Sequence, residues 1–452
     1  MTRSAVLVST YEMGRQPFGL ASASAWLRAE GWSVACLDLA KQRLRDADVA
    51  AADLVAFHLP MHTATRLAGP VIARVHHLNP AARLCAFGLY GPLNQQWLQS
   101  LGVTDVLGGE FEEDLASVAR DVAAARPAVP GSRPGSLPKI HFLVPDRSGL
   151  PALSAYVTLQ RPEGGRRIVG YTEASRGCRH LCRHCPVVPV YNGQFRVVQP
   201  EIVLADIAAQ VAAGAGHITF GDPDFFNGPT HAMRIVEALH EAHASVSYDV
   251  TIKVEHLLRH RDLIPRLSAT GCAFVTSAVE SVDDGVLGLF DKGHTRADFI
   301  TAVGVCRDAG VTLAPTFVAF HPWLTLESYC NLLETIEQLD LVEHVAPIQL
   351  AIRLLVPDGS RLLTLPEMRQ HLGAFDANTL THRWSHPDPR VDQLQADVMA
   401  LVGVRLATDR RLLFEQVRAL ARDRAGLPPA PADTHPARAR ATVPYLNEPW
   451  YC

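Results

Sequence analysis

The first 125 residues alternate short apolar runs with longer stretches in which apolar residues recur every three or four positions. Short runs rich in β-branched residues are typical of buried strands, and the longer stretches have the period of amphipathic helices. Strands are predicted at 5–9, 33–39, 54–59, 84–89 and 105–107, with helices at 18–30, 63–77, 93–101 and 110–125. Strict alternation of strand and helix predicts an α/β domain over 1–125, with a doubly wound parallel sheet.

A second series of strand–helix units begins near residue 170. Between the two series, residues 126–138 contain four prolines, two glycines and two serines, and we place a linker over 126–169. The later strands are predicted at 171–175, 217–221, 245–254, 273–279, 312–320 and 347–356. Six units in tandem predict a partial (β/α)6 barrel over 170–360, with active groups at the carboxyl ends of its strands.

The pattern changes again in the C-terminal region, 361–452. Helices are predicted near 365–372 and over 389–424, followed by a segment rich in proline and alanine. The region is therefore expected to be mainly helical, ending in an aromatic tail that closes on Cys452.

Composition and charge exclude several classes of protein. The chain of 452 residues has 48% apolar residues and a net charge of −4, which offers no electrostatic footprint for nucleic acid. No apolar run approaches the ~18 residues of a membrane span, and the N-terminal run is too short for a signal peptide. We therefore expect a cytoplasmic protein with no membrane or nucleic-acid partner. The odd count of nine cysteines argues against a disulfide framework.

Three of the nine cysteines lie within eight residues, as Cys178-x3-Cys182-x2-Cys185, directly after the first predicted barrel strand. Three thiolates on one short loop can ligate three irons of a [4Fe–4S] cluster and leave the fourth iron open for a substrate. Gly177 allows a tight turn before them. The nearby arginines, Arg176, Arg179 and Arg183, are expected to offset the negative charge of the thiolates.

Two other interpretations of the three cysteines stay open. His180 or His184 can complete a zinc site, and the protein is then a non-catalytic, zinc-stabilised scaffold or binding protein. The chain lacks the second distant cysteine pair of typical zinc knuckles. The other interpretation is inert buried thiols, which is what we expect of the isolated cysteines Cys36, Cys85, Cys272, Cys306 and Cys330.

The cysteine spacing after the first strand of a six-fold βα repeat resembles the radical S-adenosylmethionine (SAM) superfamily. With the sheet domain in front, the chain resembles the members that combine a B12-binding domain with a radical SAM core. The resemblance implies a [4Fe–4S] cluster and SAM as cofactors, and reductive cleavage of SAM to start radical chemistry. It also implies a small-molecule substrate and an electron donor such as flavodoxin or ferredoxin. The SAM bond that breaks stays open, and methyl or aminocarboxypropyl transfer are both candidates.

Cobalamin is a possible further cofactor. The N-terminal domain lacks the Asp-x-His-x2-Gly motif, whose histidine ligates cobalt in many B12-binding domains. Cobalamin without a protein ligand and a purely structural sheet domain are both compatible with this sequence. The segment 11–19, after the first strand, lies where a cofactor or substrate would meet the domain edge.

The resemblance also implies residues that contact SAM. Gly221 and Asp222, or Asp224, end the second barrel strand, where the superfamily has an element that holds the SAM amino group. A helix cap formed by Asp224 is the structural alternative.

Further along the chain, Ser277, Glu280 and Ser281 resemble a stretch that contacts the ribose or methionine part of SAM, and residues 292–295 resemble the Lys-Gly-His-Thr stretch that follows it. Lys253, after the third strand, is expected to face the cavity or form a surface ion pair. Arg353, on the sixth strand, is a candidate for the SAM carboxylate.

The last six residues, 447–452, resemble the segment before the tail of the CUAEP/CCAEP-tail radical SAM (seleno)proteins. The resemblance raises the hypothesis that the natural product continues through a selenocysteine codon after Cys452. Trp450 and Tyr451 would anchor such a tail, and Cys452 would then present a soft sulfur ligand to the active cavity, so it is a candidate catalytic residue. A tail without a role is the alternative.

Overall fold

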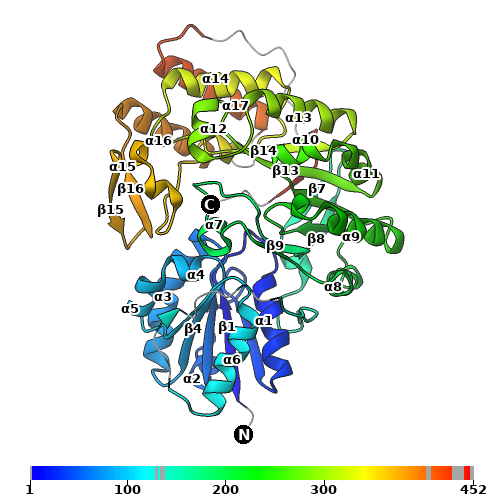
Figure 1. The fold of residues 1–452 in the computed structure, drawn as a ribbon, viewed down its shortest axis with the longest axis vertical. Helices are drawn as coiled ribbons and strands as arrows, with labels where there is room; N and C mark the ends of the chain where they lie inside the picture. Colours follow the sequence, from blue (N-terminus) through cyan, green and yellow to red (C-terminus); the bar gives the residue numbers. More distant parts are fainter. Residues whose placement is uncertain are drawn as a thin grey trace.

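A computed structural model of the protein describes residues 3–127, 131–132, 137, 139–403, 409–429 and 442–447. Figure 1 shows two lobes stacked along the long axis, with β9 (Ser175–Gly177) and α7 (Val187–Tyr191) lying between them. None of the helices in the described residues is long and apolar enough to cross a membrane.

The N-terminal lobe is the doubly wound parallel sheet that the sequence predicts. Its strands follow the order β2-β1-β3-β4-β5-β6, and all of the pairs are parallel. Alternate side chains of β1 point to opposite faces: Val6 and Val8 pack with α3, and Ala5 and Leu7 pack with α1 and α6. The strands are β1 (Ser4–Ser9), β2 (Ser33–Asp38), β3 (Leu54–His58), β4 (Arg83–Phe87), β5 (Asp105–Leu107) and β6 (Gly131–Ser132). The helices are α1 (Phe18–Ala29), α2 (Asp46–Ala50), α3 (His62–Leu78), α4 (Tyr90–Leu93), α5 (Gln95–Ser100) and α6 (Phe111–Ala123).

The second lobe contains a curved sheet in the order β14-β13-β12-β11-β8-β7-β17, which confirms a partial barrel. Its five parallel strands are β8 (Arg166–Thr172), β11 (His217–Phe220), β12 (Ser247–Thr251), β13 (Cys272–Glu280) and β14 (Thr312–Phe317). The helices that cover it are α8 (Pro200–Ala212), α9 (Pro229–Ala242), α10 (Val254–Arg259), α11 (Ile264–Ala269), α12 (Asp284–Phe290), α13 (Arg296–Asp308) and α14 (Leu326–Gln338).

The sixth predicted strand, 347–356, is not a continuous strand. Its first half forms the 3-10 helix η4 (Pro347–Leu350), and the rest meets the sheet through a single parallel bridge between Phe320 and Arg353. Pro347 has no backbone N–H to donate to a ladder, which favours a turn at this position.

Much of the interval 126–169 is ordered structure and not a free linker. In its described part, β6 extends the first sheet, and β7 (Thr158–Gln160) and β8 belong to the second. Ile140, Phe142 and Leu153 are buried in the core of the second lobe. Their burial holds the crossing segment against the second lobe, and Leu150 packs against the core of the first. The proline and glycine content did not reveal this packing.

The C-terminal region contains strands as well as the helices predicted for it. A hairpin of β15 (Leu372–Asp376) and β16 (Thr381–Trp384) follows α15 (Pro366–Arg369), and β17 (Tyr445–Leu446) pairs with β7. The long predicted helix is described as two helices, α16 (Pro389–Gly403) and α17 (Arg410–Arg424). The proposed tail after Asn447, including Cys452, lies outside the described residues.

Candidate functional site: a buried thiol loop and an inter-lobe cavity

The three clustered cysteines follow the first barrel strand on one loop. The chain leaves β8, forms β9, passes Cys178, Cys182 and Cys185, and returns as β10 (Phe195–Val197), antiparallel to β9. Gly177 turns the chain into the loop with a φ of +75°. A Cβ atom there would lie 2.5 Å from the backbone oxygen of Gln194, so the position requires glycine.

The three thiols interact with one another, and two of them are buried while Cys185 is half-buried. Cys178 and Cys182 are 9% and 6% exposed, and none of the three is in a disulfide. Burial, with Asp224 and Cys182 adding to it, raises the pKa of Cys178 to about 11. Burial and the two neighbouring thiols raise the pKa of Cys185 to about 12. Because thiolates are the metal ligands, an iron–sulfur cluster would displace these protons. The set of three soft donors fits a [4Fe–4S] cluster with one open iron.

Two buried lysines supply the positive charge beside the thiols. Lys253, at the N-terminus of α10, places its Nζ 3.6 Å from the Sγ of Cys182. Lys292 is 3% exposed, and this burial by itself lowers its pKa. The negative charges of Glu280, Cys182 and Cys185 have the larger effect, so the pKa of Lys292 is raised overall. Lys253 therefore faces the thiols and not the surface.

The expectation that nearby arginines neutralise the thiolates is wrong. Arg176 pairs with Glu112, Glu173 and Glu110. Arg179 lies over the ring of Phe195 at 4.6 Å, and Arg183 donates to the carbonyls of Gly288 and Leu289. Their long side chains reach past the loop, because partners on other elements hold them.

Glu280 ends β13 in a strained conformation. Its φ is +70°, and the register of β13 with β14 shifts beside it. The Oε1 atom lies 3.1 Å from the Nε2 of His184 and 3.4 Å from the Nζ of Lys292. Burial favours the neutral acid, but Lys292 and His184 more than offset it and hold the pKa of Glu280 at about 2. The residue thus joins the thiol loop to β13 as a carboxylate.

Gly221 and Asp222, the predicted partners of the SAM amino group, have structural contacts of their own. A Cβ on Gly221 would lie 1.8 Å from the hydroxyl of Tyr171. Asp222 accepts from the N–H of Ala174 at 2.9 Å and the hydroxyl of Ser175 at 2.5 Å. Burial raises the pKa of Asp222 to about 7. Asp222 therefore braces the segment that leads into the thiol loop.

Asp224 has the helix-capping contact that was the structural alternative. Its Oδ1 accepts from the N–H of Phe226, and its Oδ2 lies 2.7 Å from the Nδ1 of His256 and 3.5 Å from the Nε2 of His180. Ligand atoms of Cys178, His180 and Asp224 lie within 4.8 Å of one another. Asp224 therefore connects the thiol loop to α10.

Of the remaining predicted residues, Ser277 and Ser281 lie in or next to β13, and Arg353 lies beside the C-terminal region. Ser277 is fully buried in β13 with no hydrogen-bond partner for its hydroxyl, and Ser281 accepts from the N–H of Asp283. Arg353 donates to Asp392 at 2.7 Å and to the carbonyl of Trp384 at 2.8 Å, and it stacks on the Trp384 ring. The contacts of Arg353 hold it in the C-terminal region, and none of them leads toward the thiols.

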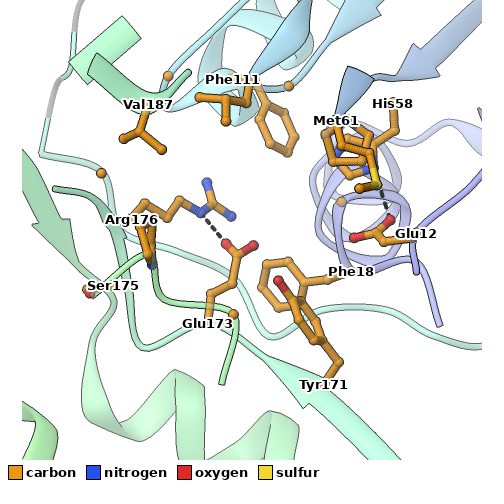
Figure 2. A pocket seen from close by; sticks show the side chains of 18 of the residues that line it. Glu12, Phe18, His58, Met61, Phe111, Tyr171, Glu173, Ser175, Arg176 and Val187 are labelled. Carbon is orange, nitrogen blue, oxygen red and sulfur yellow. Dashed lines mark hydrogen bonds and ion pairs between the residues drawn. The ribbon is translucent and has the colours of Figure 1, made fainter. Parts of the chain in front are cut away.

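A cavity of about 200 Å³ lies between the two lobes, as Figure 2 shows. The N-terminal lobe contributes residues that follow the carboxyl ends of its strands, among them Glu12 and His58. The second lobe contributes Tyr171, Glu173 and Arg176. Sequence reasoning located segment 11–19 at this edge but missed His58, Glu173 and the role of Arg176, because the cavity is lined by residues that come from separate elements of both lobes.

Comparisons with known proteins agree with this arrangement. Residues 172–339 match the family model described as the radical SAM superfamily. A tRNA-2-methylthio-N(6)-dimethylallyladenosine synthase of Desulfosudis oleivorans is 25% identical over 199 residues, 40% of each chain. A hopanoid C-3 methylase of Methylococcus capsulatus is 26% identical over 151 residues, 33% of this chain and 29% of the relative. The chain thus matches less than half the length of these relatives.

Solved structures share the two-lobed fold. The cobalamin-dependent SAM radical enzyme OxsB, with aqua-cobalamin and SAM bound, has a TM-score of 0.70 at 13% identity, over 94% of this chain and 70% of its own. The radical SAM methyltransferase TsrM from Kitasatospora setae has a TM-score of 0.60 at 17% identity, over 75% and 72%. With the thiol loop at the head of the matched segment, residues 172–339 carry a radical SAM domain, which is the domain of an enzyme.

Proposed function

We propose that the protein cleaves SAM at a [4Fe–4S] cluster held by Cys178, Cys182 and Cys185, and transfers a SAM-derived carbon group to a small-molecule acceptor. The observation that carries the proposal is the group of three free thiols, two of them buried, at the carboxyl end of the first barrel strand, with two lysines beside it. Names among the relatives support group transfer, since they include a methylase and methylthio-group enzymes.

When bound and reduced, the cluster would supply one electron to the sulfonium of SAM, so that one carbon–sulfur bond would break to a thioether and a carbon radical. Bonding of this carbon to the acceptor would replace a hydrogen, which would leave as a proton while its electron returned to the cluster, so the transfer would be redox-neutral. The one-electron donor would be a flavodoxin or ferredoxin. The residues of the chain hold and shield this chemistry. The thiolates of the loop fix the cluster, and Lys253 and Lys292 offset their negative charge. Glu280 keeps Lys292 in place and stays a carboxylate for hydrogen bonds from SAM.

Cobalamin stays a possible further cofactor, since the neighbours OxsB and TsrM bind it, but the inter-lobe cavity would have to widen to admit it. The cavity measures about 200 Å³, and a corrinoid is larger than the drug-sized ligands that fill pockets of roughly 300–1,000 Å³. His58 stands at the cavity, but its ring stacks on Phe87, and a Cβ on Gly19 would lie 2.2 Å from its Nε2. The proposed reaction therefore contains no step that uses cobalamin.

The test is anaerobic reconstitution of the full chain, with iron and sulfide analysis and a SAM cleavage assay with dithionite. The parent is expected to bind four irons and to form a nucleoside product from SAM. The product identifies the bond: 5′-deoxyadenosine, S-adenosylhomocysteine and methylthioadenosine each correspond to a different cleavage. Cys182→Ala should lose cleavage, and the matched control Cys330→Ala, at a buried thiol on α14, should keep it.

A colourless protein that holds one zinc would contradict the proposal. So would full SAM cleavage by Cys182→Ala.

A further inference from the structure

The inter-lobe cavity lies where ligands bind in open α/β sheets. In the order β2-β1-β3, the connections after β1 and β3 leave on opposite faces of the sheet, because α1 and α3 pack in different cores. Ligands bind in the crevice at such a switch point, outside the carboxyl ends of the strands. Glu12 follows β1 and His58 ends β3, so both stand at this crevice.

The second lobe closes the cavity close to the thiol loop. Tyr171, Glu173 and Ser175 line it, and Ser175 is three residues before Cys178. A molecule in the cavity therefore lies beside the segment that leads into the site of SAM cleavage. None of the three thiols lines the cavity.

Negative charge exceeds positive charge in and behind the cavity. Arg176 pairs with Glu112 at 2.7 Å, Glu173 at 2.7 Å and Glu110 at 3.3 Å, so one guanidinium serves three carboxylates. Glu12 adds a fourth, and Arg15 is the second cation of the lining. Burial raises the pKa of Glu173, Arg176 opposes that rise, and Glu12 adds to it. The carboxylates of Glu12 and Glu173 therefore repel one another across the space.

Glu12 is a buried carboxylate with one oxygen that accepts no hydrogen bond from the described residues. The residue is 9% exposed, and its Oε2 accepts no hydrogen bond, although the Nδ1 of His58 lies 3.3 Å away. In Figure 2 the carboxylates of Glu12 and Glu173 both point into the space that Phe18 and Phe111 border. A buried carboxylate without a hydrogen-bond donor costs free energy that a bound donor would recover.

The walls favour an organic cation over a metal ion. Phe18, Tyr171 and Phe111 line the cavity and give it apolar walls for a carbon skeleton. Arginines of the chain already lie over these three rings, which shows that the rings attract organic cations. Among the described residues, the one group of three metal-ligating side chains is Cys178, His180 and Asp224, and the cavity carboxylates form no such group.

We propose that the inter-lobe cavity binds a small protonated amine, with its ammonium between Glu12 and Glu173 and its carbon skeleton against the aromatic walls. This amine is the acceptor substrate of the radical reaction, so its role rests on the proposed function. The volume of about 200 Å³ restricts it to a compact molecule.

The binding test uses calorimetric titration of the full chain with n-butylammonium chloride, with n-butanol and butanoate as probes of the same shape. The ammonium is expected to bind at least tenfold more tightly than either. Glu12→Gln and Glu173→Gln should each weaken it at least tenfold, and Glu201→Gln, at an exposed residue of α8, should not. Equal binding of the three probes would overturn the proposal, and this outcome does not depend on any variant folding correctly.

The same titration with hydroxocobalamin separates the two candidate ligands. The proposal would be overturned if hydroxocobalamin bound tightly, butylammonium did not compete with it, and butylammonium alone did not bind. Iron content and SAM cleavage are measured in parallel. If the chain loads iron and cleaves SAM but binds no amine, only the cavity assignment is refuted. If it binds amines but does not load iron, the proposed function is refuted.

Discussion

At the scale of the residue, Glu280 combines a strained backbone with a buried ion pair. A non-glycine residue at a φ of +70° costs on the order of 1–3 kcal/mol and persists only where the surroundings enforce it. The contacts with His184 and Lys292 supply that enforcement. The strain holds the carboxylate at the end of β13, where the thiol loop and Lys292 meet.

Removing the charge of Glu280 should destabilise the protein. Glu280→Gln leaves the ammonium of Lys292, 3% exposed, without its carboxylate, and breaking a buried pair costs roughly 3–5 kcal/mol. Urea unfolding of the cluster-free chain measures the loss. The control is Glu237→Gln, which removes an exposed pair with Arg266 and should change stability by about 0.5 kcal/mol or less. Equal effects of the two variants would contradict the account of Glu280.

His321 should make stability depend on pH. Burial holds the pKa of this 3%-exposed side chain at about 3, below its ordinary 6.5. The unfolded state then binds more protons below pH 6.5, so stability falls as pH falls through that value and continues to fall toward pH 3. Between pH 7.5 and 5.5 the loss is about 1.4 kcal/mol.

The variant His321→Phe should lack that loss, because phenylalanine does not titrate. Thermal or urea unfolding of both proteins at the two pH values measures the difference. His77→Gln, at an exposed residue of α3, serves as the control and should follow the parent. The same pH dependence in His321→Phe would show that another group is responsible.

At the scale of the element, the hairpin of β9 and β10 sets the thiol loop. Gly177 combines a φ of +75° with a Cβ position 2.5 Å from a backbone oxygen, so alanine there cannot be accommodated by moving a side chain. Gly165 has a similar φ of +87°, but no atom lies within 4 Å of its Cβ position. The two glycines therefore separate backbone strain from steric conflict.

Gly177→Ala should impair cluster assembly, and Gly165→Ala should not. Both substitutions carry the strain of a left-handed alanine, on the order of 1 kcal/mol. The first also displaces the strand that leads to Cys178. Iron per chain and the visible absorption of the reconstituted protein report the outcome. Equal iron loading by the two variants would mean that the hairpin does not position the thiols.

At the scale of the whole molecule, Arg176 joins the lobes. It comes from β9 of the second lobe, and its guanidinium meets Glu110 and Glu112 of the N-terminal lobe, both of them buried. It also lies against the rings of Phe18, Phe111 and Phe142. One residue next to the thiol loop thus couples the position of the sheet domain to the radical SAM core.

Arg176→Met should loosen the lobes. Several buried carboxylates lose their one guanidinium, and we expect a loss of roughly 3–5 kcal/mol. Small-angle scattering should show a larger radius of gyration, and thermal unfolding a lower midpoint. Arg166→Met, an exposed residue of β8, is the control and should match the parent. An unchanged radius with an unchanged midpoint would show that the lobes dock without Arg176.

Local sequence signals determined most of the elements and the position of the thiol loop. The predicted strands of the first lobe agree with β1 to β5 within about two residues, because the period of apolar residues reports the local backbone state. The spacing of Cys178, Cys182 and Cys185 likewise predicted three thiols on one short loop, and the structure places them on the loop between β9 and β10. Composition did not show that segment 139–157 packs into the core, because its burial depends on partners far away in the chain.

Only the tertiary structure decided which side chains meet. The arginines next to the thiols in sequence turn to other partners, and Lys253 and Lys292 approach from separate elements. The predicted sixth strand became a single bridge, and Arg353 joined Asp392. The cavity unites Glu12 and His58 with Glu173 across the two lobes. Such contacts depend on strand register and lobe docking, to which residues far apart contribute jointly, so no local pattern in the sequence records them.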